Sequence, residues 1–134
     1  MSMFEWKEQY SVGCTQIDTQ HKRLFQYADE LHVAMAAGKG KEVLSKTLGN
    51  LIAYTKSHFA SEEALMQRHH YGAFLQHKQV HDKLTAQVVQ FQQEFETGRA
   101  GMTVQLMQFL KDWLTHHIGE TDRKVAEHIR NRAA

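Results

Sequence analysis

Proline is absent from this chain, cysteine occurs once, and glycine occurs only eight times in 134 residues. Since proline breaks helices and glycine weakens them, their scarcity favours long uninterrupted helices. The one cysteine, Cys14, excludes an internal disulfide and is typical of a protein in a reducing compartment. We interpret Cys14 as a small apolar side chain, with a reactive thiol as the alternative.

An excess of one charge and long apolar runs are also missing. The 16 Lys and Arg residues against 15 Asp and Glu residues leave a formal net charge of +1, which argues against a protein that binds nucleic acid by neutralising phosphates. The first ten residues, MSMFEWKEQY, lack the apolar centre of a signal peptide, and no apolar run is long enough to span a bilayer. We therefore expect a soluble cytoplasmic protein with no nucleic-acid partner and no membrane span.

Four segments carry apolar residues at spacings of three and four, which is the period of a buried helix face, and no segment alternates as a strand does. Short connections between these segments make neighbouring helices antiparallel. The sequence therefore predicts an all-α protein, an antiparallel up-down-up-down four-helix bundle. The predicted helices start after an N-cap at Asp18 and stop before Gly38, run from about Lys41 to the RHHYG segment, run from Ala73 to about Thr97, and start near Met102.

We expect residues 1–134 to form a single domain. The bundle would occupy about 19–130, and residues 1–17 would form an extended N-terminal arm. Three aromatic residues of this arm are expected to anchor it against the bundle: Phe4, Trp6 and Tyr10.

Six polar side chains fall on the inward faces of the predicted helices. Left unpaired in a core, each would cost roughly 2–7 kcal/mol, whereas a bound metal would satisfy them together. Two pairs have a spacing of four residues, which places both members on one helix face one turn apart. All six are expected at one end of the bundle: His21, His58, Glu62, His77, His81 and His117.

Five histidines and one carboxylate would suit two metal ions bridged by carboxylates, and nitrogen and oxygen ligands of this kind suit iron. A second bridging carboxylate is expected near His117, with Glu120 and Asp122 as the candidates. Helical spacing favours Glu120, because Asp122 lies roughly 140° from His117 on an ideal helix. A π-bulge at Gly119 would instead turn Asp122 inward.

Four segments resemble the hemerythrin family, specifically its single-domain bacterial members, and the resemblance covers nearly the whole chain. All seven liganding positions of the family are filled, and the resemblance implies Asp122 as the second bridge. The segments are IDTQHKRLF with His21, HFASEE with His58 and Glu62, HKQVH with His77 and His81, and HIGETD with His117 and Asp122.

The resemblance implies reversible binding of O₂, for its storage, transport or delivery, and not an enzyme. It implies two iron ions per chain, joined by an oxo or hydroxo bridge, with O₂ as a ligand. It also implies three ligand groups: His77, His81 and His117 on one iron, His21 and His58 on the iron that keeps an open position for O₂, and Glu62 and Asp122 as bridges.

Apolar residues beside the expected ligands predict a dry O₂ pocket, in which irreversible oxidation would be slow. We interpret Leu114 as the best candidate for controlling access, with ordinary core packing as the alternative role for the whole set. The candidate pocket residues are Leu24, Phe25, Phe59, Trp113 and Leu114.

Other titratable residues are interpreted as lying outside the metal set. His116 is the main competitor, because its spacing to Glu120 repeats that of His58 and Glu62, but His116 lies at the edge of the apolar arc. Glu63 and Glu120 are expected to be surface or supporting groups, and His128 to face solvent. The histidines set aside are His32, His69, His70, His116 and His128.

Three alternative functions stay open: O₂ or redox sensing through a partner, a di-iron oxidase or peroxidase, and an iron store of the ferritin type. Ferritin-like sites use Glu-x-x-His pairs, which this chain lacks, so the ferritin type is disfavoured. A zinc site in the same cage is a further alternative. We expect a monomer, with an O₂-consuming enzyme as a candidate recipient of the O₂.

Overall fold

The computed structural model describes residues 4–97, 102–117 and 122–133. These residues form one short 3-10 helix and five α-helices. The elements are η1 (Glu8–Tyr10), α1 (Thr15–Ala36), α2 (Lys41–Arg68), α3 (Phe74–Glu96), α4 (Met102–His116) and α5 (Arg123–Ala133).

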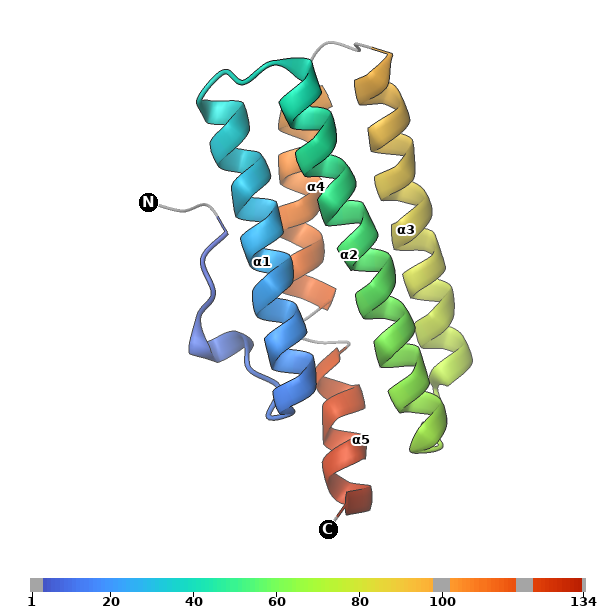
Figure 1. The fold of residues 1–134 in the computed structure, drawn as a ribbon. Coiled ribbons are helices and arrows are strands. Elements are labelled where there is room, and N and C mark those ends of the chain that lie inside the picture. The colour runs from blue at the N-terminus through green and yellow to red at the C-terminus, as the bar shows by residue number, and fades with distance from the viewer. Residues whose placement is uncertain (1–3, 98–101, 118–121, 134) are drawn as a thin grey trace.

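Figure 1 shows α1, α2 and α3 side by side, with α4 behind them. Each of these four helices packs against two others, so they close a ring around a shared core. Successive helices run in opposite directions, which confirms the predicted antiparallel up-down-up-down four-helix bundle. In Figure 1, α5 lies below α4, at the end of the bundle where α1 begins. Within the described residues, no helix combines the length and the apolar character needed to cross a membrane.

The first helix begins earlier than predicted. α1 starts at Thr15, so Asp18 lies inside the first turn and the predicted N-cap is wrong. The Asp18 carboxylate instead accepts hydrogen bonds from Ser11 Oγ at 2.6 Å and from the Val12 N–H at 2.8 Å. Asp18 therefore fastens the N-terminal arm to α1, and its negative charge near the helix N-terminus is favourable.

The remaining predicted boundaries are close to the observed ones. α1 ends at Ala36, and Gly38 follows with φ of 68°, the left-handed conformation that favours glycine after a helix. α2 starts at Lys41, as predicted, and α3 starts directly after Ala73. The predicted fourth helix is observed as two helices, α4 and α5.

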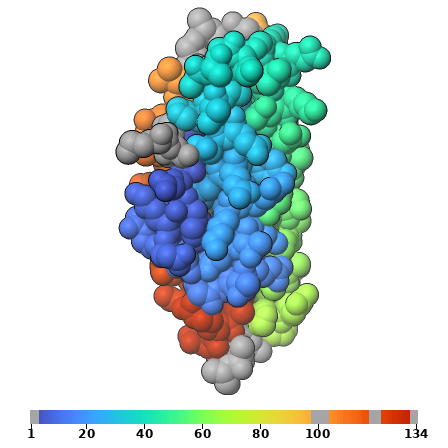
Figure 2. Space-filling model, turned by 60° about the vertical axis from the view of Figure 1, so that its left-hand side comes forward, coloured from blue at the N-terminus to red at the C-terminus, as the bar shows by residue number. Residues whose placement is uncertain are grey.

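The three aromatic residues of the arm pack against the bundle, as predicted. Phe4 is 4% exposed and belongs to the main apolar core. The Trp6 ring meets the Phe25 ring edge-on at 5.7 Å, and the Tyr10 ring stacks on Phe25 at 5.1 Å. Figure 2 shows the arm, in dark blue, lying against α1 just above α5.

The arm is also fastened to α5 by two arginines. Arg123 donates from Nη2 to the backbone carbonyl of Gln9 at 3.0 Å, and Arg130 donates from Nη1 to the carbonyl of Val12. Gly13, which follows Val12, has φ of 79°, and a Cβ there would collide with Arg130 Nη1. Because only glycine adopts this backbone conformation readily, Gly13 keeps the path of the arm open for Arg130.

We expect the Gly13→Ala substitution to lower the free energy of unfolding by about 1–2 kcal/mol, the usual cost of a left-handed residue with a Cβ. The matched control is Gly49→Ala, because Gly49 lies inside α2 with open space around it. That change should raise the free energy of unfolding by about 0.5–1 kcal/mol. Urea denaturation followed by circular dichroism measures both, and equal effects of the two substitutions would contradict this role of Gly13.

Candidate metal centre

Seven ionisable side chains from the walls of the bundle meet in its interior. None of them is more than 6% exposed, which is unusual for residue types that rarely lie fully buried unless they are paired. They come from α1, from α2, from α3 and from the junction of α4 with α5. These residues are His21, His58, Glu62, His77, His81, His117 and Asp122.

Apolar side chains close this polar layer on both sides. The main apolar core fills the bundle, and a second apolar cluster lies at the end where α1 begins. On α1, His21 lies between Ile17 of the second cluster and Leu24 of the main core. Leu114 and Val125 bracket the junction of α4 and α5 in the same way. The polar layer therefore lies between two apolar clusters and is well shielded from solvent.

The seven side chains form two groups of possible metal ligands. In each group, one ligand atom from every member lies within 4.8 Å of those from all the other members. Glu62 and Asp122 belong to both groups. The first group adds His77, His81 and His117, and the second adds His21 and His58. Two metal ions held by these groups would share both carboxylates.

The direction of these side chains tests whether a metal fits. The Nε2 atom of His21 lies 2.9 Å from Asp122 Oδ2, and that of His117 lies 3.0 Å from Asp122 Oδ1. Despite these short distances, the two imidazole nitrogens and both oxygens of Asp122 make no hydrogen bond. His58 Nε2 and Glu62 Oε2 also make none. Buried polar atoms without hydrogen bonds are rare. A metal ion bound between such converging nitrogen and oxygen atoms would satisfy them. The residues therefore fit a metal centre.

One contact in the layer is a hydrogen bond. His77 donates from Nε2 to Glu62 Oε1 at 2.6 Å, and the same nitrogen lies 3.1 Å from Asp122 Oδ1. The Nε2 atom of His77 thus faces both carboxylates that the two groups share. This arrangement gives His77 the same inward direction as the other four imidazoles.

Asp122 reaches the layer from the position directly before α5. His117 and Asp122 both have π-helical conformation, and Asp122 is fully buried. Asp122 Oδ1 lies 3.0 Å from Nε2 of His117, so the two side chains meet in the layer although they lie five residues apart. Glu120, which ideal spacing favoured, and Gly119 lie outside the described residues. The burial of Asp122 and its contact with His117 therefore support Asp122 as a candidate metal ligand.

The five histidines that were not predicted as metal ligands lie outside the buried polar layer. His116 is exposed, in contrast to its buried neighbour His117. His69 and His70 lie in the turn between α2 and α3, where His70 has φ of 54°. The expectation that His128 faces solvent is wrong in part, because its Nε2 donates to the carbonyl of His69 at 2.7 Å and holds that turn. His32 meets the Phe4 ring edge-on at 6.4 Å, near the arm.

The five candidate pocket residues are all buried in the main core, at most 5% exposed: Leu24, Phe25, Phe59, Trp113 and Leu114. Phe59 has the most direct contact with the polar layer. Its ring stacks on His81 at 3.9 Å between centroids and meets His117 edge-on at 5.9 Å. Phe25 instead contacts the aromatic residues of the arm.

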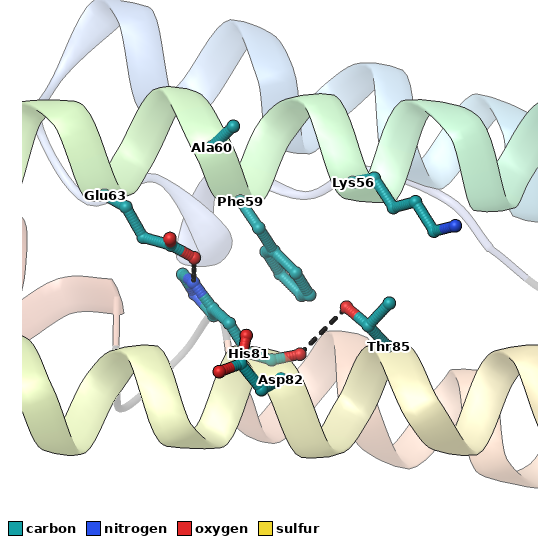
Figure 3. A pocket seen from close by; sticks show the side chains of 7 residues that line it. All are labelled: Lys56, Phe59, Ala60, Glu63, His81, Asp82 and Thr85. Carbon is teal, nitrogen blue, oxygen red and sulfur yellow. Dashed lines mark hydrogen bonds and ion pairs between the residues drawn. The ribbon is translucent and has the colours of Figure 1, made fainter.

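A cavity of about 270 Å³ lies between α2 and α3, and both Phe59 and His81 line it. Figure 3 shows the Phe59 ring beside His81, with Glu63 and Asp82 among the polar residues that line the cavity. Glu63 accepts a hydrogen bond from Nδ1 of His81 at 2.9 Å, and its role as a supporting group of a metal ligand stays a prediction. Gln20, which is hydrogen-bonded to His58 across 38 positions in sequence, was not expected, because no local pattern signals such a long-range contact.

The charges of the layer perturb one another. Burial and the charge of Asp122 oppose ionisation of Glu62, but the imidazoles of His58, His77 and His81 outweigh them and hold the pKa of Glu62 at about 2. Burial likewise disfavours the charged form of His77, yet Asp122 and Glu62 raise its pKa to about 9. Although burial again opposes ionisation, His117 and the other close imidazoles hold the pKa of Asp122 well below its usual value. Both carboxylates are thus ionised at neutral pH, as metal ligands must be.

Comparison with known proteins gives one consistent result. A family model described as "Hemerythrin HHE cation binding domain" matches residues 12–129. A bacteriohemerythrin from Methylococcus capsulatus is 35% identical over 124 residues, which cover 92% of this chain and 94% of that protein. One from Stenotrophomonas maltophilia is 29% identical over 130 residues, covering 97% of this chain and 84% of that protein. A crystal structure of wild-type hemerythrin has a TM-score of 0.88 at 32% identity, covering 96% of this chain and 98% of that one.

The pKa values of His77 and Glu62 predict how the stability of the protein stripped of metal depends on pH. The raised pKa of His77 contributes stability that is fully present below pH 6.5 and is lost as the pH rises through about 9. The lowered pKa of Glu62 contributes stability that is present above pH 4.5 and is lost as the pH falls through about 2. Both contributions are complete between pH 4.5 and 6.5.

We therefore expect the thermal midpoint of the stripped protein to fall as the pH is raised from 6.5 to about 9. The control is His77→Gln, which removes the titrating imidazole and should flatten the profile over this range. Differential scanning calorimetry measures both profiles. A midpoint that stays level or rises in the unsubstituted protein would contradict the assigned pKa of His77.

Proposed function

The chain belongs to the hemerythrin family, whose members are non-heme di-iron proteins that bind O₂, and from that premise we propose that it binds O₂ reversibly at a di-iron centre. One observation carries the proposal: two groups of buried ligand atoms share the carboxylates of Glu62 and Asp122. In the proposed centre, His77, His81 and His117 would hold one iron, His21 and His58 would hold the other, and Glu62 and Asp122 would contribute to both.

The two groups differ in the number of imidazoles that they offer. One has three histidines and the other has two, while both use the same pair of carboxylates. An iron held by His21 and His58 would therefore have one protein ligand fewer, and we propose that this site would leave a position for O₂. Bound iron supplies the coordination position and the electrons that O₂ binding needs.

The chain's own residues make the binding reversible by keeping water and protons away. The ligands lie in a layer that apolar side chains close on both sides, and a dry site disfavours separation of charge. Phe59 covers part of this layer on the side of the cavity of Figure 3, since its ring stacks on His81 and both side chains line the cavity. Control of access by Leu114, which is fully buried, is a further part of the proposal.

Reversible binding is favoured over turnover by the composition of the ligand set. Five imidazoles and two carboxylates make a site richer in nitrogen than the carboxylate-rich sites of ferritin-like proteins. We propose storage or delivery of O₂ as the role in the cell. Anaerobic loading with Fe(II), admission of O₂ and its removal should give a visible absorption band that appears and fades in step with O₂. Irreversible bleaching, or turnover of an added reductant, would favour an oxidase or peroxidase instead.

The assignment of the ligand from the fourth helix is tested by His117→Ala. We expect this variant to retain fewer than two iron ions per chain after Fe(II) loading and desalting, because it removes a buried imidazole from the first group. The matched control is His116→Ala, since His116 is the exposed neighbour. Iron content measured by plasma emission should stay at two per chain in the control. Loss of iron from His116→Ala but not from His117→Ala would reverse the assignment.

The role of Phe59 as a cover of the polar layer is tested by Phe59→Leu. The smaller side chain would uncover more of the His81 ring to the cavity, so we expect irreversible oxidation of the O₂ complex to become several-fold faster. The control is Phe91→Leu, because Phe91 packs against Phe109 away from the ligands. Decay of the O₂-dependent absorption band measures the rate. Equal rates in the two variants would show that Phe59 does not protect the site.

A further inference from the structure

The two proposed iron sites are supported by chemically different groups. His81, a ligand of the three-histidine site, donates from Nδ1 to the carboxylate of Glu63 at 2.9 Å. His58, a ligand of the two-histidine site, donates from Nδ1 to the amide oxygen of Gln20 at 2.7 Å. Each hydrogen bond places the proton on Nδ1 and leaves Nε2 free to face the metal. One imidazole is thus supported by a carboxylate and the other by a neutral amide.

The orientation of the Gln20 amide is set by its other contact. Its Nε2 donates to Ser61 Oγ at 3.0 Å, so its oxygen is the atom turned toward His58. Gln16 donates to the same hydroxyl at 3.1 Å. With the amide reversed, its NH₂ group would face Nδ1 of His58 and force the proton onto Nε2, where it would block a metal. Ser61 therefore supports a metal-binding tautomer of His58 indirectly, because it orients the Gln20 amide.

Glu63 imposes the same tautomer on His81 by charge. An ionised carboxylate only accepts hydrogen bonds, so Nδ1 of His81 must donate. The Glu63 side chain is 19% exposed and lines the cavity between α2 and α3, so its charge stays in contact with water while the His81 ring is 1% exposed. A carboxylate that accepts from one nitrogen of an imidazole raises the basicity of the other nitrogen, which an amide does more weakly.

We propose that Glu63 is a positioning residue that fixes the ring and tautomer of His81 and makes the three-histidine iron the more electron-rich of the two. The inference rests on the proposed di-iron function. The ferric state is then stabilised more strongly at the iron that holds His81, through Glu63. Among the described residues, the neutral Gln20 supports His58, and Nδ1 of His21 has no hydrogen-bond partner, so an iron held by these two histidines would retain its ferrous state more readily.

Three variants separate position from charge. Glu63→Leu removes the acceptor, and Glu63→Gln keeps an acceptor oxygen of similar shape without the charge. Asp82→Asn is the matched control, because Asp82 lines the same cavity and loses the same charge but pairs with Lys78 rather than with His81. Each protein is loaded anaerobically with ⁵⁷Fe(II), titrated with a ferrous chelator, and measured by Mössbauer spectroscopy and by redox titration.

We expect Glu63→Leu to bind the iron of the three-histidine site, which holds His81, about 10–100-fold less tightly, the usual effect of removing such a supporting group. In the same variant, one quadrupole doublet of the Mössbauer spectrum should change while the other is preserved. Glu63→Gln should keep the affinity nearly unchanged but shift the reduction potential of the centre to a more positive value. Asp82→Asn should match the unsubstituted protein in all three measurements.

The inference is overturned if Glu63→Leu binds iron as tightly as Asp82→Asn, or if Glu63→Gln and Asp82→Asn shift the potential equally. Either outcome leaves the proposed function standing, because the unsubstituted protein would still bind two iron ions. Failure of the unsubstituted protein to bind two iron ions would instead refute the proposed function itself. A change of both doublets in Glu63→Leu would also overturn the inference, since it would show a general loss of structure rather than an effect through His81.

Discussion

The sharing of two buried carboxylates between two sets of imidazoles is the constraint on which the rest of the structure depends. Glu62 and Asp122 are both fully buried, and neither could remain ionised there without positive charges or hydrogen-bond donors beside it. Five histidines converge on them from the four walls of the bundle, yet most of the facing atoms make no hydrogen bond. The apolar clusters on both sides shield this layer from solvent, and Asp122 enters it from the position directly before α5.

Much of the fold and of the candidate site can be predicted from the sequence, because the signals are local. Apolar spacing and short connections predict the antiparallel bundle, and the pair His77 and His81 lies one turn apart on a single helix. Asp122 is different: ideal helical spacing points to Glu120, and only the family resemblance corrected this, since a π-helical distortion has no reliable sequence signal. The capping role given to Asp18 failed because a carboxylate in a first turn can cap a preceding loop as well as its own helix.

The groups behind the ligands show why the outer part of such a site is harder to predict than its centre. The four-residue spacings of His58 to Glu62 and of His77 to His81 are visible along single helices. In contrast, Gln20 meets His58, and Glu63 meets His81, only after α2 has packed against α1 and α3. These contacts differ in charge, so the bundle supports two similar ligand sets unequally. The two ligand groups differ in their number of histidines and in the charge of the residues that are hydrogen-bonded to those histidines. Both differences point to two metal positions with different chemistry.

The central claim, two iron ions that share Glu62 and Asp122, is tested most directly by anomalous scattering at the iron absorption edge. Crystals would be grown from protein loaded anaerobically with Fe(II). Two anomalous peaks are expected, one against Nε2 of His77, His81 and His117 and one against Nε2 of His21 and His58, with both carboxylates touching each peak. A single peak, or a peak bound by His116, would contradict this account of the centre.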